Sequence, residues 1–147
     1  MRWLVIVPLA LLLAGCGSAP PPAPVDPTTE AWYGETVQRL AGLNRDAEQA
    51  LASRHSDAAA AAVVSGQELE KRLLSVRQPT LAATEAVTDL DRLYGRMLLA
   101  NRHYGWARIM FQKNLARWKY WRPESPESAR RLQQAKDDIA ECDKYLP

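Results

Sequence analysis

Apolar residues recur at every third or fourth position from Thr29 onward, which is the spacing of one face of an α-helix. No stretch of strand length alternates strictly between apolar and polar residues. The pattern therefore predicts an all-α domain. Its first helix begins at Thr28 or Thr29, either of which can cap it, and ends near Ser53. The apolar face of that helix consists of Tyr33, Val37, Leu40, Ala47 and Leu51.

Breaks in this pattern divide the next part of the chain. A second helix is expected to begin after a cap at Ser56 or Asp57 and to continue as far as Pro79, because proline disfavours helical geometry in the residue before it. A third apolar stripe covers 83–97. The weak break at 101–103 either separates this stripe from the next one or lies within one long helix.

Two further helices complete the domain. One is expected over 104–121, and its core face consists of Tyr104, Ala107, Phe111, Leu115 and Trp118. The other begins where Ser125 is followed by Pro126, since a capping residue followed by proline favours the start of a helix. The sequence thus predicts a bundle of four to five antiparallel helices.

The first fifteen residues have a different pattern. A cationic start is followed by an apolar run of about a dozen residues, too short for a membrane span of roughly 20 residues. The run ends in Leu13-Ala14-Gly15-Cys16, which resembles the lipobox of bacterial lipoproteins residue for residue. That resemblance implies cleavage before Cys16, a diacylglycerol thioether on its sulfur and a fatty acid on its new amino group. An ordinary cytoplasmic N-terminus is the alternative.

A proline-rich stretch follows the lipobox. Its five prolines favour an extended conformation that would hold a domain up to roughly 35 Å from the lipid headgroups. We therefore divide the chain into a signal peptide over 1–15, a lipidated cysteine with a disordered tether over 16–29, and a helical domain over 30–147. Gly17 stands where an aspartate retains Gram-negative lipoproteins in the inner membrane, so the resemblance favours the outer membrane.

Charge is nearly balanced in total, with 19 basic and 17 acidic residues, but it is unevenly distributed. The segment 92–122 holds eight basic residues and no acidic one. Helical geometry places several of them, together with aromatic residues, on the side opposite Phe111 and Leu115. The candidate binding surface consists of Arg102, Trp106, Lys113, Arg117 and Tyr120.

Two interpretations of this segment remain open. Basic residues mixed with aromatic residues can hold phosphate headgroups or an acidic partner. Alternatively, acidic flanking helices neutralise the segment inside the fold, and its aromatic side chains pack in the core.

The segment 88–121 also resembles a single tetratricopeptide repeat, whose two helices pack through small residues. Gly95 stands at the glycine of the first helix, and Ala107 and Phe111 stand at the alanine and the aromatic residue of the second. Asp91 departs from the pattern, because the family has tryptophan there. The resemblance implies hairpins of paired helices, although such repeats usually need about three copies for stability.

Residues with catalytic chemistry are scarce. The two histidines, His55 and His103, both fall in expected turns and form no metal-ligand spacing with Cys142. Cys142 lies on the apolar side of the last helix, where a buried and inert thiol is expected. No glycine-rich phosphate loop and no nucleophile elbow are found. We therefore expect no enzyme activity, no metal and no cofactor.

Taken together, the sequence predicts a membrane-anchored periplasmic helical lipoprotein in the bacterial envelope. We expect it to act as a protein-protein interaction or assembly accessory module that is anchored to the membrane through Cys16. The alternative is a binder of anionic envelope lipid or polymer through 92–122. Nucleic acid is not expected as a partner in that compartment.

Overall fold

The computed structural model describes residues 25–147, and this part of the chain is all-helical, as the sequence predicts. The expected signal peptide, Cys16 and most of the tether lie outside the described residues. A short 3-10 turn, η1, precedes five α-helices. The elements are η1 Pro27–Thr29, α1 Ala31–Ala52, α2 Ser56–Leu74, α3 Leu81–Ala100, α4 Tyr104–Tyr120 and α5 Pro126–Asp143.

Helix α1 begins later than its apolar pattern predicts, and neither threonine caps it. Asp26 accepts a hydrogen bond of 2.9 Å from the backbone N–H of Thr28, so it caps η1. Glu30 then turns the chain into α1 in an extended conformation. The aspartate is a better cap than the threonine that follows it, and Pro27 suits the first position of a helical turn.

Helix α2 ends five residues before the proline that was expected to stop it. Its last residue is Leu74, and the chain then crosses to Thr80, whose hydroxyl accepts from the backbone N–H of Ala83 and caps α3. Further along the chain, Ser125 caps α5 as predicted, and Ser128 completes a reciprocal capping box with it.

The weak break at 101–103 is a true turn, so the chain has five helices rather than four. Arg102 has a φ of 62°, which is a left-handed backbone conformation. The backbone N–H of His103 donates to the carbonyl of Leu98 at 2.8 Å. This bond is the signature of a Schellman motif, which satisfies the last carbonyls of a helix.

The turn between α1 and α2 has the same geometry. Arg54 has a φ of 60°, and the N–H of His55 donates to the carbonyl of Ala50 at 2.8 Å. The pattern Leu-Ala-x-Arg-His-x-x-x-Ala begins at Leu51 and again at Leu99, 48 positions later. The two turns therefore share both a sequence pattern and a backbone geometry.

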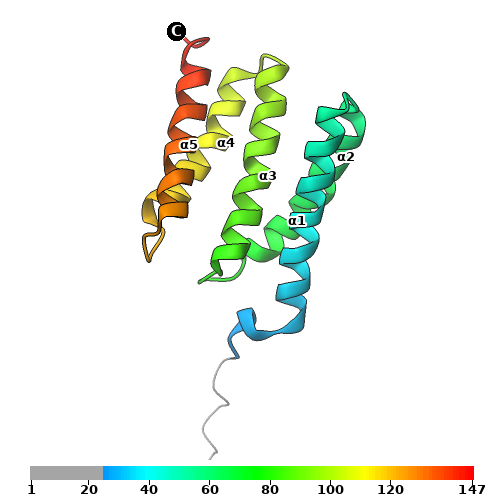
Figure 1. The fold of residues 1–147 in the computed structure, drawn as a ribbon, viewed down its shortest axis with the longest axis vertical. Coiled ribbons are helices and arrows are strands. Elements are labelled where there is room, and N and C mark those ends of the chain that lie inside the picture. The colour runs from blue at the N-terminus through cyan, green and yellow to red at the C-terminus, as the bar shows by residue number, and fades with distance from the viewer. Residues whose placement is uncertain (1–24) are drawn as a thin grey trace, which may run out of the picture.

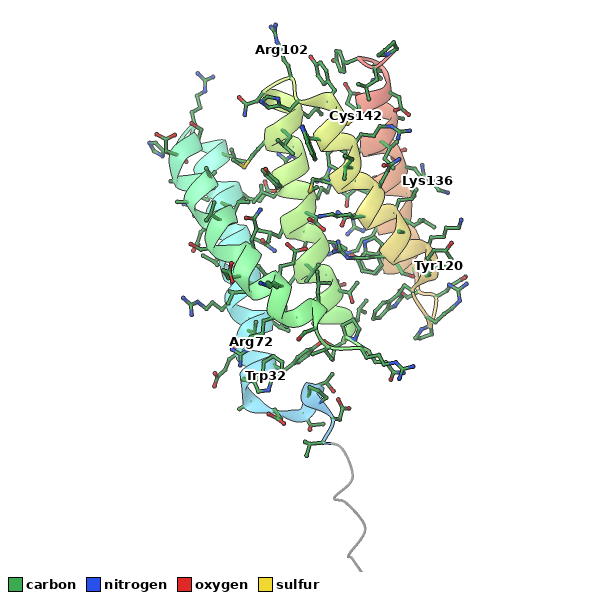
Figure 2. The ribbon with its side chains drawn as sticks, turned by 180° about the vertical axis from the view of Figure 1, so that it is seen from behind. Trp32, Arg72, Arg102, Tyr120, Lys136 and Cys142 are labelled. Carbon is green, nitrogen blue, oxygen red and sulfur yellow. The ribbon has the colours of Figure 1, made fainter. Side chains whose placement is uncertain are left out.

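The helices are arranged as two hairpins and a fifth helix (Figure 1). Helices α1 and α3 contact each other, and α5 packs on α4. One face of the domain is formed by α1, α3 and α5, which together line a hollow of about 440 Å³. Helices α2 and α4 lie on the other face, where they flank α3 (Figure 2).

Close approach of helices depends on small residues. An added Cβ at Gly95 of α3 would lie 2.5 Å from a ring carbon of Phe111 in α4, a separation that real Cβ atoms do not tolerate. Phe111 is 1% exposed and packs with the fully buried Ala107 and Cys142. Gly66 of α2 leaves similar room for Leu90. Only glycine at these positions allows the helices to pack at this distance.

We predict that Gly95→Ala lowers the free energy of unfolding by about 1–3 kcal/mol, because the new methyl group overpacks the core against Phe111. Chemical denaturation measures this loss. Gly34→Ala is the matched control, since no atom lies within 4 Å of its Cβ position and alanine favours helix. Phe111→Leu should recover part of the loss in the double variant. A Gly95→Ala protein as stable as the control would contradict the packing.

Candidate functional site

The surface with the most distinctive chemistry is the solvent-facing side of α4. Its aromatic and aliphatic residues follow helical spacing, and we call Trp106, Ile109, Lys113 and Tyr120 the outer stripe. Trp106 is 64% exposed and Tyr120 is 72% exposed. The opposite side of α4 buries Ala107, Phe111 and Trp118. Helix α4 is therefore apolar on two sides, of which only one is covered.

The structure does not bring the five sequence-predicted residues of this surface into one patch. Arg102 lies in the turn before α4, and Tyr120 is the last residue of the helix (Figure 2). At 1.5 Å per residue, Trp106 and Tyr120 are separated by roughly 21 Å along the helix axis. A partner would have to lie along α4 to touch both ends.

Arg117 was expected on the exposed surface of α4, but its side chain is paired inside the domain. Its guanidinium donates to the carboxylate of Asp91 in α3 and lies 3.5 Å from Glu70 in α2. Lys113 remains half-exposed, with its Nζ 3.9 Å from Asp91. Arg117 thus joins α2, α3 and α4 inside the domain.

Most other basic residues of 92–122 are also paired. Arg92 forms two hydrogen bonds with Asp138 of α5, and Arg96 forms two with Glu48 of α1. Arg108 lies 2.6 Å from Asp143. These pairs support the interpretation in which acidic helices neutralise the segment. In the described part of the chain, Arg102 and Lys119 are the cations of this segment without an ion pair.

The cluster around Arg117 shifts the titration of Glu70. Asp91 is 4% exposed and is held between Arg117 and Lys113. Burial, followed by the negative charge of Asp91, raises the pKa of Glu70 from its ordinary value of 4.5 to about 7. Arg117 and Lys113 offset only part of this rise.

A groove of about 670 Å³ lies beside this cluster, on the face formed by α2 and α4. Its apolar lining comes from the C-terminal ends of α2 and α4 and from the start of α3. The lining includes Leu73, Leu74, Pro79, Val87, Tyr120 and Trp121. Arg117 and Arg122 supply its charged groups. We call it the α2–α4 groove.

The remaining candidates for chemistry lie apart from one another. His55 and His103 are the N-cap residues of α2 and α4, in two separate turns. Cys142 is buried, and burial raises the pKa of its thiol. Over residues 25–147, no three His, Cys, Asp or Glu side chains lie together in a way that could hold a metal ion.

The lipobox residues Leu13, Ala14, Gly15 and Cys16 lie outside the described residues, so lipidation remains a prediction. None of the helices described over 25–147 is long and apolar enough to cross a membrane. Comparison with protein-family models, curated proteins and solved structures found no match to this chain. The tetratricopeptide resemblance likewise remains a prediction.

Sequence reasoning missed three features of this region. It did not find the α2–α4 groove, because the two walls come from segments more than forty residues apart. It did not identify Glu70, whose neighbours Asp91 and Arg117 belong to other helices. It also missed the repeated pattern at Leu51 and Leu99, which was visible in the sequence.

The raised pKa of Glu70 predicts a pH-dependent stability. The folded protein holds this proton more tightly than the unfolded chain, so the contribution is greatest below pH 4.5 and is lost as pH rises through about 7. We expect the free energy of unfolding to fall by about 1–3 kcal/mol over this pH interval. The Glu70→Gln variant should not show this pH-dependent fall.

Urea denaturation at several pH values measures this effect. Glu68→Gln is the matched control, because Glu68 lies on the same helix and is exposed. The control should keep the pH dependence of the unaltered protein. Identical pH profiles for the unaltered protein and Glu70→Gln would show that Glu70 is not buried as described.

Proposed function

We propose that this chain is a lipid-anchored protein of the bacterial envelope whose helical domain binds another protein through Trp106 and Ile109 of the outer stripe of α4. The anchor is the lipidated Cys16 implied by the lipobox. The tether then places the domain in the periplasm, and Gly17 favours the outer membrane. The domain works by position: the anchor fixes it near the membrane, and α4 captures the partner.

The observation that carries this proposal is the uncovered apolar side of α4. Large exposed aromatic residues at helical spacing are typical of protein-protein contacts, where tryptophan and tyrosine contribute most of the binding energy. Trp106 and Ile109 lie one turn apart in the first half of the helix, and both are exposed. The other side of α4 already packs in the core.

The geometry of the stripe indicates the kind of partner. A stripe with helical spacing suits a second helix packed along α4 at an axial separation of about 8–10 Å. Lys113 lies within the stripe, and Arg102 precedes it without an ion pair of its own in the described residues. We therefore expect an amphipathic partner helix with apolar residues and carboxylates on one side.

The alternative is a binder of anionic envelope lipid or polymer through 92–122. Most cations of that segment are engaged within the domain, which weakens this alternative. Contacts made by the remaining exposed charges would be screened within about 10 Å at 0.1 M salt. An apolar protein interface would persist at high salt.

Site-specific crosslinking in the native envelope tests the proposal. With a photoreactive residue at Ile109, we expect one major crosslinked protein, and the yield should remain when the salt concentration is raised. The matched control is a photoreactive residue at Ala140, which is exposed on α5 and outside the stripe. Trp106→Ala should reduce the crosslink at Ile109 at least tenfold, as expected for a binding residue worth about 2 kcal/mol.

Two outcomes would contradict the proposal. Equal crosslinking at Ile109 and Ala140 would show that the stripe has no preferred partner. A yield at Ile109 that disappears at high salt would indicate exposed charge contacts and would favour the lipid or polymer alternative.

A further inference from the structure

One end of the domain lies close to the place where the chain would be anchored. The described chain begins at Val25, at the same end as the α2–α3 and α4–α5 connections (Figure 1). The backbone N–H of Thr80 donates to the hydroxyl of Tyr33 at 2.9 Å, which fixes the start of α1 beside the start of α3. We call this the tether end.

The length of chain before Val25 limits how far this end can be from an anchored bilayer. Cys16 precedes Val25 by nine residues. A fully extended chain spans at most about 3.6 Å per residue, so the tether end lies within roughly 30 Å of a lipidated Cys16. A bilayer holding Cys16 is therefore at high effective concentration for this end of the domain.

The tether end is also where apolar side chains are exposed. The α2–α4 groove is formed there by the last turns of α2 and α4 and the first turns of α3. Of its lining residues, Leu74 is 50% exposed and Tyr120 is 72% exposed. Leu81, the first residue of α3, is 37% exposed. These side chains remain available to a partner because no part of the described domain covers them.

Two chain segments at the groove are basic, and the acidic residues beside it, Glu70 and Asp91, are paired with Arg117. The segment 71–81 contains three basic residues and no acidic one, and the segment 117–123 repeats this composition. Lys71, Arg77 and Lys119 form no ion pair with the described residues. Arg122 pairs only with the exposed Glu124 that follows it, at 3.3 Å.

We infer that the tether end of the domain contacts an anionic phospholipid surface. Leu74, Leu81 and Tyr120 enter the headgroup region, and Lys71, Arg77 and Lys119 meet lipid phosphates. Apolar side chains combined with cations are the composition that binds the surface of anionic bilayers. The contact rests on the proposed lipid anchor, which supplies the bilayer, and it leaves Trp106 facing away from the membrane.

A bilayer fits this surface better than a second protein does. The groove opens at the end to which the tether leads, and a membrane within roughly 30 Å is the one surface that an anchored domain always meets. Each exposed contact is weak by itself, but the anchor makes a weak contact effective. The domain would then stand with α4 directed away from the membrane and with Trp106 at the far end of that helix.

The test uses the full acylated protein purified from its host and reconstituted in vesicles of phosphatidylethanolamine and phosphatidylglycerol with brominated acyl chains. An environment-sensitive fluorophore is attached in the Tyr120→Cys variant and, as matched control, in the Trp106→Cys variant. Both positions are exposed on α4. Cys142 is fully buried and should not be labelled, and the sulfur of Cys16 carries the lipid.

We expect the bromine atoms to quench the label at position 120 roughly threefold more than the label at 106, since an interfacial helix end lies about 5–10 Å into the headgroup boundary. The double substitution Leu74→Glu with Leu81→Glu should make quenching at 120 equal to quenching at 106. Val64→Glu should leave them unchanged, because Val64 is an exposed aliphatic residue of α2 outside the groove. Uncharged phosphatidylcholine vesicles should weaken the difference.

Three outcomes would overturn the inference. Equal quenching at 120 and 106 would show that the tether end does not touch the bilayer. Protection of position 120 only after an envelope protein extract is added would assign the groove to a protein. If the protein does not float with salt-washed vesicles, it has no lipid anchor, and both this contact and the proposed function are wrong. If the protein floats but the label at position 120 is not quenched, only the proposed membrane contact is wrong.

Discussion

Burial of α3 is the constraint on which the rest of the domain depends. This helix contacts α1 and α2 on one side and α4 on the other. Asn44 of α1 and Asn114 of α4 each donate at 2.8 Å to a backbone carbonyl of α3, at Ala86 and Thr88. Buried side-chain amides of this kind fix how a helix is rotated, because an unmade bond to a buried group costs about 1–3 kcal/mol.

The same constraint explains why α4 has an uncovered apolar side. The inner residues of α4 pack against α3 and α5. The guanidinium of Arg117, also on α4, pairs with Asp91 of α3 and Glu70 of α2. Trp106 and Ile109 have no role in that packing. The surface they form is consistent with a second partner for α4, whereas Tyr120, at the other end of the same helix, lines the groove at the tether end.

Apolar spacing was sufficient to predict an all-α bundle of four to five helices, because each helix buries a stripe at intervals of three and four residues, but it left open whether the chain turns at 101–103. It could not predict that Asp91 and Arg117 pair, since long charged side chains reach partners on other helices and helical rotation alone placed Arg117 far from the core. The likeness of the two turns was also missed. It is carried by a short pattern around the turn residues Arg54 and Arg102, rather than by the apolar stripes of the helices.

The proposed anchor would set the compartment, the orientation and the range of partners of the domain, so it is the claim to test first. Mass spectrometry of the protein isolated from its own host measures it directly. The account predicts a mature chain that begins at Cys16 and carries a diacylglycerol thioether and an N-linked fatty acid on that residue. An unacylated chain that still begins at Met1 would contradict the account.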